Sequence, residues 1–346
     1  IEEDAFEEPK PTISLIRMKE NYGINYKEIK EITIPPFVNI IGDSTFSEFS
    51  SLVQINIPPS VIEIGPNAFR KCQSLTKMTI PPNLTTIAEN AFVECTSLNC
   101  FELQNTSNFG SIEIYANIEE LIISGPVDTI PKDFCKGHPN LKRLEITAQI
   151  SEICESAFEG CPALHTIDIS KVSSISDNAF KDCISLTNVI MTSTLSIGQS
   201  AFQGCTSLEK IDIPSVSSLG NCAFKDCTKL TEIKIPAVKN INQSVFEGCI
   251  ALTNVDMQTV EIIGNNAFKG CVLINNIQFP LTLTSIGESS FENCTSLTII
   301  DISSVTSIGQ NAFGGCSSLG QATVHGSLEI AANSFPSSTG VNKKTQ

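Results

Sequence analysis

IGQSAFQGCTSLEKIDIP, at residues 197–214, is the stretch of sequence that decides the fold of this chain. The same pattern recurs with drift along the sequence, and its copies align on one phenylalanine. Most neighbouring copies lie 22 residues apart, three steps are 23 residues long and one is 24. Self-similarity at this period predicts a solenoid of stacked coils. The aligned residues are Phe46, Phe69, Phe92, Phe134, Phe158, Phe180, Phe202, Phe224, Phe246, Phe268, Phe291, Phe313 and Phe335.

A gap of 42 residues separates Phe92 from Phe134 and contains a degraded copy. Placing Ile112 in the phenylalanine position puts Ile118, Leu121 and Ile123 in the apolar positions that follow. The next repeat, FCKGHPNLKRLEI, then carries one extra residue before its leucine. Residues 104–140 are therefore the least regular part of the repeat region.

The segment LxxIxIP within each copy alternates apolar and polar residues, which predicts a short strand with one buried face. In the copy quoted above the apolar residues are Leu208, Ile211 and Ile213, followed by Pro214. Proline ends such a strand because it has no N–H for the hydrogen-bond ladder. Strands from successive coils would form a parallel sheet with a step of about 4.8 Å.

A second apolar pair, such as Val216 and Leu219, turns the chain back into the core, and the phenylalanine fills the core on the far side. A glycine usually follows this pair, with Asn242 and Cys154 among the exceptions. Glycine or asparagine at this place predicts a left-handed backbone turn. The glycines of this position include Gly65, Gly198, Gly220, Gly264, Gly287 and Gly309.

The repeat predicts one domain organised in three parts along the 346 residues. Residues 1–31 hold an acidic leader and an N-terminal cap, because terminal repeats must close the core. Residues 32–335 form the solenoid, and residues 336–346 form a polar C-terminal tail.

The chain carries a net charge of −15, which disfavours binding to nucleic acid and to anionic membrane surfaces. No stretch approaches the roughly 20 consecutive apolar residues of a membrane helix, so we expect no membrane insertion by this segment. A cationic or polar protein partner is compatible with this charge.

These residues resemble the leucine-rich repeat superfamily in its BspA-like (Treponema-type) branch. The branch is marked by LxxIxIPxxVxxIGxxAFxxC, which stands almost unchanged at residues 52–72 (LVQINIPPSVIEIGPNAFRKC). The resemblance covers residues 32–335 and implies a right-handed solenoid of about 13–14 repeats of 22–23 residues. It also implies a non-enzymatic protein, because no catalytic residues come with the family. The family occurs on the surfaces of oral and gut bacteria and of protist parasites and is associated with adhesion to host cells and matrix proteins.

Ten of the 14 cysteines stand three residues after an aligned phenylalanine, and the first copy has Phe49 in that place. An apolar position favours buried free thiols, since cysteine behaves there as a small apolar residue. Neighbouring coils would bring these thiols within bridging distance, so disulfides remain an alternative. Cys154 and Cys222 are expected to be partly exposed.

Signatures of catalysis are missing, with no GxSxG, HExxH, GxxxxGK[ST] or GxGxxG in the chain. Cys135 and His138 form one C-x-x-H pair, but a structural zinc site needs four ligands and no second pair has a matching spacing. We therefore expect no catalytic residue, no metal and no cofactor.

Charged residues fall in two outward-facing columns of the predicted strands, on the concave face where such repeats bind their partners. One interpretation of the columns is a solvated face that keeps the protein soluble, and the other is a docking surface for a basic or polar protein. The predicted contact residues are Glu102, Glu145, Asp168, Lys210, Asp212, Glu232, Lys234, Asp256 and Asp301.

Two functional hypotheses follow from the sequence. The first is a surface or secreted adhesin-like protein of a microbe that binds host or matrix proteins. The second is an intracellular structural spacer in a larger assembly, such as a cytoskeletal complex, which the unpaired cysteines would suit. A third and weaker hypothesis is that the chain is the targeting arm of an enzyme.

Overall fold

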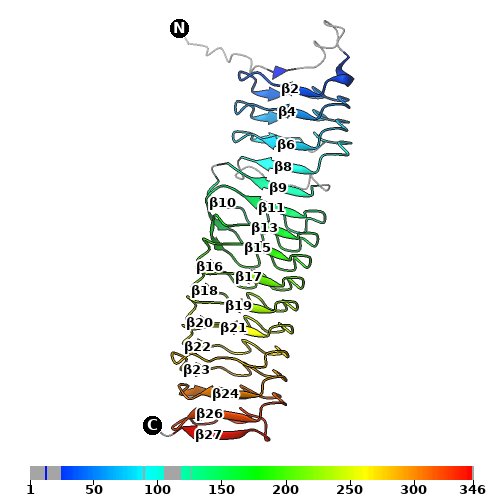
Figure 1. The fold of residues 1–346 in the computed structure, drawn as a ribbon. Helices are drawn as coiled ribbons and strands as arrows, with labels where there is room; N and C mark the ends of the chain where they lie inside the picture. The colour runs from blue at the N-terminus through cyan, green and yellow to red at the C-terminus, as the bar shows by residue number, and fades with distance from the viewer. Residues whose placement is uncertain (1–11, 14–24, 89, 105–117, 126, 345–346) are drawn as a thin grey trace, which may run out of the picture. The chain divides into compact units, whose positions relative to one another are not determined.

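The computed structural model describes residues 12–13, 25–88, 90–104, 118–125 and 127–344. The chain divides into two compact units, Ile1–Val127 and Asp128–Gln346. Each unit is a parallel β-solenoid, and the described ranges together complete about 14 turns. Each regular turn contributes one short strand to a first row and one to a second row, which Figure 1 shows as two columns of arrows. The helical structure assigned in the described part is the 3₁₀ turn η1 (Tyr26–Glu28).

From β1 to β8 the described strands of the first unit alternate between the two rows in chain order, and β9 follows β8 in the first row. The first row contains β2 (Glu31–Thr33), β4 (Gln54–Asn56), β6 (Lys77–Ile80), β8 (Cys100–Leu103) and β9 (Glu120–Ile123). The second row contains β1 (Thr12–Ile13), β3 (Ile40–Ile41), β5 (Glu63–Ile64) and β7 (Thr86–Ile87). β1 pairs with β3, so the second row begins upstream of residue 32.

The strands of the second unit alternate in the same way, except that β22 and β23 follow each other in the second row and β26 and β27 in the first. Its first row contains β11 (Arg143–Ile146), β13 (Thr166–Asp168), β15 (Asn188–Ile190), β17 (Lys210–Asp212), β19 (Glu232–Lys234), β21 (Asn254–Asp256), β24 (Ile299–Ile302), β26 (Gln321–His325) and β27 (Gly340–Lys344). Its second row contains β10 (Thr129–Ile130), β12 (Ile150–Ile153), β14 (Val172–Ile175), β16 (Ser196–Ile197), β18 (Ser218–Leu219), β20 (Asn240–Ile241), β22 (Ile262–Ile263), β23 (Ser285–Ile286) and β25 (Ser307–Ile308).

The core is built from the apolar positions that the repeat predicts. Phe202, Phe224 and Phe246 are fully buried, and their rings stack with centroid distances of 5.5 and 5.8 Å. Val216 and Leu219 are also fully buried, which confirms the inward turn after the strand. In the degraded copy, Ile118, Leu121 and Ile123 are buried as expected, whereas Ile112 lies outside the described residues.

The alignment at Phe134 is wrong by one residue. The backbone N–H of Cys135 donates to Ala157 O, as the N–H of Phe158 donates to Ala179 O, so Cys135 occupies the phenylalanine position. Phe134 takes the preceding alanine position and meets Phe158 edge-on instead of stacking on it. His138 then occupies the cysteine position, and this repeat has no extra residue before its leucine.

The cysteines form a column of buried thiols, as predicted. All 14 cysteines are unbridged, the ten of the column are buried, and Phe49 is buried in the same position. Each column thiol donates to a carbonyl in the phenylalanine position of the preceding coil, with S···O distances between 2.9 and 3.3 Å. The thiol therefore satisfies a buried backbone acceptor while remaining apolar enough for the core. Cys154 and Cys222 are partly exposed, which confirms the expectation for this pair.

The glycine that follows the second apolar pair is needed for space, not for a left-handed turn. None of the six glycines named for this position has a positive φ. A Cβ on Gly220 would lie 2.3 Å from Gln199 N, and one on Gly198 would lie 2.6 Å from Asp177 N. The prediction of a left-handed turn here was wrong because sequence alone cannot separate a positive φ from close backbone contact.

Left-handed residues instead lie two positions before and two positions after the buried phenylalanine. Cys222 and Asp226 flank Phe224 with φ of 58° and 59°, and Ser200 and Gly204 flank Phe202 with φ of 54° and 73°. Asn, Asp and Gly tolerate this conformation best, and they recur at these two positions. This pair of residues explains the tight turns on both sides of the core aromatic ring.

Candidate protein-binding surface

Five of the predicted contact residues lie together on three neighbouring strands of the second unit. In β17, β19 and β21 the central residue is buried and the flanking side chains point outward, as the alternation requires. Lys210 is in register with Glu232, and Asp212 is in register with Lys234, which is in register with Asp256. We call the outward side of these three strands the strand face.

Three charges of the strand face have no charged partner among the described residues. Lys210 forms an ion pair with Glu232, with Nζ 3.6 Å from Oε1. Across the described residues, no ion pair or side-chain hydrogen bond reaches the charged groups of Asp212, Lys234 or Asp256. These three groups are therefore hydrated in the free protein and available to a partner.

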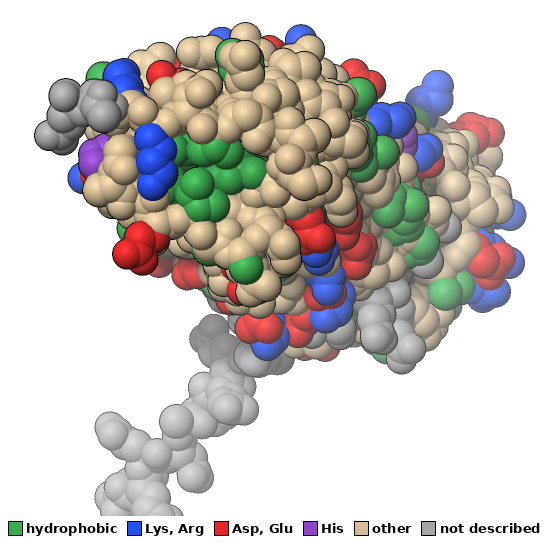
Figure 2. Space-filling view, turned by 90° about the horizontal axis from the view of Figure 1, so that it is seen from below, with side chains coloured by type: hydrophobic (Ala, Val, Ile, Leu, Met, Phe, Trp, Pro, Cys, Tyr) green, Lys and Arg blue, Asp and Glu red, His purple; other side chains and the backbone are tan. Residues whose placement is uncertain are grey.

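Several other charges of the second unit form ion pairs within the protein. After the buried aromatic position, Lys225 pairs with Glu247 at 3.1 Å and Lys269 pairs with Glu292 at 2.8 Å. Figure 2 shows acidic and basic side chains lying next to one another on the visible surface. Such exposed pairs contribute little to stability, but they leave less unbalanced charge for a ligand.

Glu102 belongs to the first unit and is held by its own neighbours. Its Oε2 is 2.8 Å from Lys77 Nζ, and Ser124 Oγ donates to its Oε1 at 2.7 Å. The hydrogen bond from Lys77 holds the pKa of the Glu102 carboxyl below its usual value. The Glu102 carboxylate therefore already has partners, unlike the acidic groups of the strand face.

Glu145 and Asp168 are brought together in register on β11 and β13. Arg143 forms an ion pair with Glu145, and Asp168 accepts a hydrogen bond from the backbone N–H of Ser170 at 3.1 Å. Both carboxylates therefore have local partners. Ile190 follows Asp168 in this column and interrupts the row of charges before β17.

Asp301 lies on β24, beyond a coil that has no strand in the first row. Its Oδ1 accepts a hydrogen bond from Ser303 N at 2.9 Å, and the pKa of Asp301 is lowered chiefly by its hydrogen bond with Ser303. Asp301 therefore caps its own turn and is not part of the cluster on β17, β19 and β21.

The coil between β21 and β24, residues 276–282, interrupts the first row, and we call it the open coil. Within the described chain, no backbone hydrogen bond joins residues 276–279 to either neighbouring strand. Phe279 stands where most other repeats have Ile, Leu, Met or Val, and its ring contacts Phe291 edge-on at a centroid distance of 5.5 Å. Phe279 is only half-buried, whereas Met257 and Ile302 in the same position of the neighbouring coils are buried.

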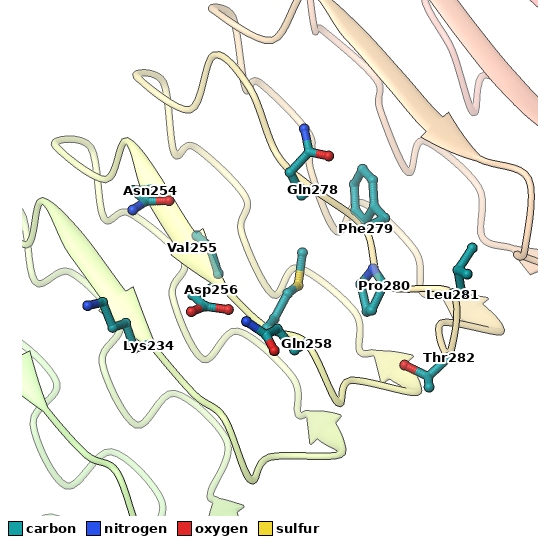
Figure 3. Close-up of a pocket in the computed structure, with 11 residues that line it drawn as sticks. Lys234, Asn254, Val255, Asp256, Gln258, Gln278, Phe279, Pro280, Leu281 and Thr282 are labelled. Carbon is teal, nitrogen blue, oxygen red and sulfur yellow. The ribbon is translucent and has the colours of Figure 1, made fainter.

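Two pockets flank the open coil. The first has a volume of about 620 Å³, and Lys234 and Asp256 of the strand face line it together with residues of the open coil (Figure 3). The second, of about 400 Å³, is lined by Asp301 and by the opposite side of the same coil. Gln278, Phe279 and Leu281 line both pockets, and none of the three was predicted as a contact residue. Two features of the sequence could have indicated these residues. Gln278 replaces the aspartate that is common at its strand position, and Phe279 replaces the usual aliphatic residue.

The C-x-x-H pair has a structural explanation. Cys135 and His138 are buried, and His138 Nδ1 accepts a hydrogen bond from the backbone N–H of Leu141 at 3.2 Å. The histidine thus closes the turn at the position where other repeats carry cysteine. Within the described residues there is no group of three or more His, Cys, Asp or Glu side chains that could hold a metal ion.

Comparison with known proteins identifies the fold family. A family model described as a BspA-type leucine-rich repeat region, with six copies, matches residues 19–133, 128–253 and 239–344. The chain belongs to the BspA-type leucine-rich repeat family. Members of this family are repeat scaffolds that typically mediate protein–protein interaction and are non-catalytic. No match was found among curated proteins.

Solved structures of bacterial leucine-rich repeat proteins are similar to this chain. A leucine-rich repeat protein from Bacteroides ovatus is 24% identical with a TM-score of 0.58, covering 91% of this chain and 92% of that one. A leucine-rich cell surface protein from Faecalibacterium prausnitzii is 27% identical with a TM-score of 0.40, covering 91% and 88%. The first of these supports the solenoid fold.

The sequence predicted no membrane insertion by this segment. In the described part of the chain, no helix has the length and apolar character needed to cross a membrane.

Proposed function

We propose that this chain is a microbial surface or secreted adhesin-like protein that binds host or matrix proteins through the strand face. The observation that carries the proposal is the cluster of Asp212, Lys234 and Asp256, whose charges have no partner among the described residues. Lys234 and Asp256 also line an open pocket on the sheet of a repeat scaffold, and such scaffolds bind proteins on their extended sheet surfaces. Membership of a non-catalytic, protein-binding family supports the same function.

Charge reversal on the strand face tests this function. We expect the double variant Asp212→Lys, Asp256→Lys to bind immobilised basement-membrane extract about tenfold more weakly than the wild type. The reason is that two carboxylates available to a basic or polar partner become ammonium groups. The measurement is biolayer interferometry at physiological salt, combined with a melting curve, which should be unchanged because surface substitutions alter stability by only about 0.5 kcal/mol.

The matched control is the double variant Glu288→Lys, Glu329→Lys, which has the same net charge. Both residues are exposed, and they lie outside the first row of strands. If the two double variants lose affinity equally, net charge and not the strand face determines binding. If neither loses affinity while the wild type binds, another surface is responsible.

One observation favours a second candidate, an intracellular structural spacer. All 14 cysteines are free, and the column thiols act as hydrogen-bond donors, which requires them to be reduced. Counting thiols in denatured, unreduced protein from its native source separates the candidates. About 14 thiols would favour the intracellular spacer, whereas a clear deficit would show an oxidising compartment and favour the adhesin.

A further inference from the structure

The open coil separates two strand edges of the first row, those of β21 and β24. β21 pairs only with β19 among the described strands, and β24 pairs only with β26. Residues 276–279 lie between them without bonding to either, so their backbone N–H and C=O groups have no backbone partner in the described part of the chain. Unpaired strand edges are the backbone groups to which an extended peptide adds.

Apolar side chains line the two pockets beside the open coil, with Ile299 in the second pocket and Leu281 in both. Leu281 is 89% exposed, and Ile299 on β24 is 54% exposed. Phe279 is half-buried beside them, with its ring against Phe291. An exposed leucine next to a partly covered aromatic ring offers a contact for one large apolar side chain of a ligand.

Polar side chains line the first pocket together with Leu281 and Phe279. The Asp256 carboxylate has no partner among the described residues, and the amides of Asn254, Gln258 and Gln278 lie around the pocket (Figure 3). In Figure 3 the Lys234 side chain extends away from Asp256, and no ion pair joins the two. A carboxylate with amide oxygens nearby accepts hydrogen bonds from a guanidinium or an ammonium group.

We propose that the pocket beside the open coil binds an extended peptide segment of the partner protein in which an Arg or Lys adjoins a large apolar residue. The basic side chain bonds the Asp256 carboxylate, and the apolar side chain packs on Leu281 and Phe279. The backbone of the segment pairs with the free groups of residues 276–279. The inference rests on the proposed function and names the chemistry of the partner at that surface.

Two further observations concern the charge and the size of the ligand. The chain carries a net charge of −15, so its overall field attracts a cationic segment. The volume of about 620 Å³ exceeds the space that one side chain needs and suits two adjacent residues with their backbone.

The test is selection from a phage-displayed random heptapeptide library on the immobilised full chain. We expect enrichment of sequences in which Arg or Lys adjoins Leu, Ile, Met or Phe. Synthetic copies of these peptides should bind Asp256→Asn about tenfold more weakly than the wild type, because a charge-assisted hydrogen bond is lost. They should bind Leu281→Ser about fivefold more weakly, because the apolar contact is lost.

Matched controls separate the pocket from general surface changes. Leu273→Ser removes an exposed leucine upstream of the open coil, and Glu288→Gln removes an exposed carboxylate outside both pockets. Binding to these two variants should stay within about twofold of the wild type. Melting curves of all four variants establish that each is folded.

Several outcomes would overturn this inference. They are a failure to enrich any sequence, enrichment without basic residues, or peptides that bind Asp256→Asn and Leu281→Ser as tightly as the wild type. Binding on a glycan array that is lost in Asp256→Asn would assign the pocket to a sugar and also overturn it. The proposed function would survive each of these results if charge reversal of the strand face still weakened binding to matrix extract.

Discussion

Replacing Phe224 by alanine is expected to lower the free energy of unfolding by about 3–5 kcal/mol. Phe224 is fully buried, and its ring stacks between Phe202 and Phe246 with centroid distances of 5.5 and 5.8 Å. Removing the ring leaves a cavity that touches three coils. In a solenoid each coil is stabilised only by its neighbours, so the loss weakens two interfaces at once. Urea titration followed by circular dichroism measures the effect.

Phe37→Ala is the matched control for this substitution. Phe37 is 67% exposed, and the variant should change the free energy of unfolding by less than about 0.5 kcal/mol. A loss below about 1 kcal/mol for Phe224→Ala would show that the aromatic column does not carry the core.

Replacing Gly220 by alanine is expected to cost about 2–3 kcal/mol, because the new Cβ collides with backbone of the preceding coil. That Cβ would lie 2.3 Å from Gln199 N and 2.4 Å from Gly198 C, and neither atom belongs to a flexible side chain. Gly220 N–H also donates to Ile197 O at 2.7 Å, so the two coils cannot separate without losing this bond. The measurement is again the free energy of unfolding in urea.

Gly270→Ala provides the comparison, because Gly270 has a φ of +74° but no neighbouring atom within 4 Å of the position that a Cβ would take. Its cost should be about 1 kcal/mol, from backbone conformation alone. Gly270→Asn should cost less still, since Asn293 takes the equivalent position with a φ of 64°. Equal losses for the alanine variants at Gly220 and Gly270, or the reverse order, would contradict the distinction between space and conformation.

Much of the fold could be predicted from the sequence because one pattern is repeated many times. A position that is apolar in every copy, such as that of Phe224, must face the core of every coil. The buried thiols followed in the same way, from Phe49 standing in the position of the later cysteines. Repetition averages out the drift of single copies, so the alignment failed at one irregular site, Phe134, whereas the wrong expectation of a left-handed glycine applied to every copy.

Those errors have physical causes. Phe134 was aligned as the core aromatic because phenylalanine is the clearest mark of the repeat, yet Cys135 occupies that position. The left-handed residues Asp133 and Gly137 flank Cys135 symmetrically, as Ser156 and Gly160 flank Phe158. Backbone conformation therefore marks the register here more reliably than side-chain type does.

The candidate surface was predicted only in part. Residues 22 positions apart lie in register on neighbouring strands, and 22 residues is the spacing of the repeat. The charges of β17, β19 and β21, which recur at this spacing, therefore lie together. The partners of Glu102 and Asp301 depend on local hydrogen bonds that no spacing reveals. The pockets beside the open coil lie where one coil forms no strand in the first row, and the repeat pattern does not predict this interruption.

Hydrogen–deuterium exchange of the full chain, with and without bound basement-membrane extract, tests the central claim most directly. It reports which backbone amides a partner covers. If the strand face and the open coil form the binding surface, protection will appear in residues 210–212, 232–234, 254–256 and 276–282. Protection confined to the second row of strands, or no change in these four segments while the extract is bound, would contradict the account.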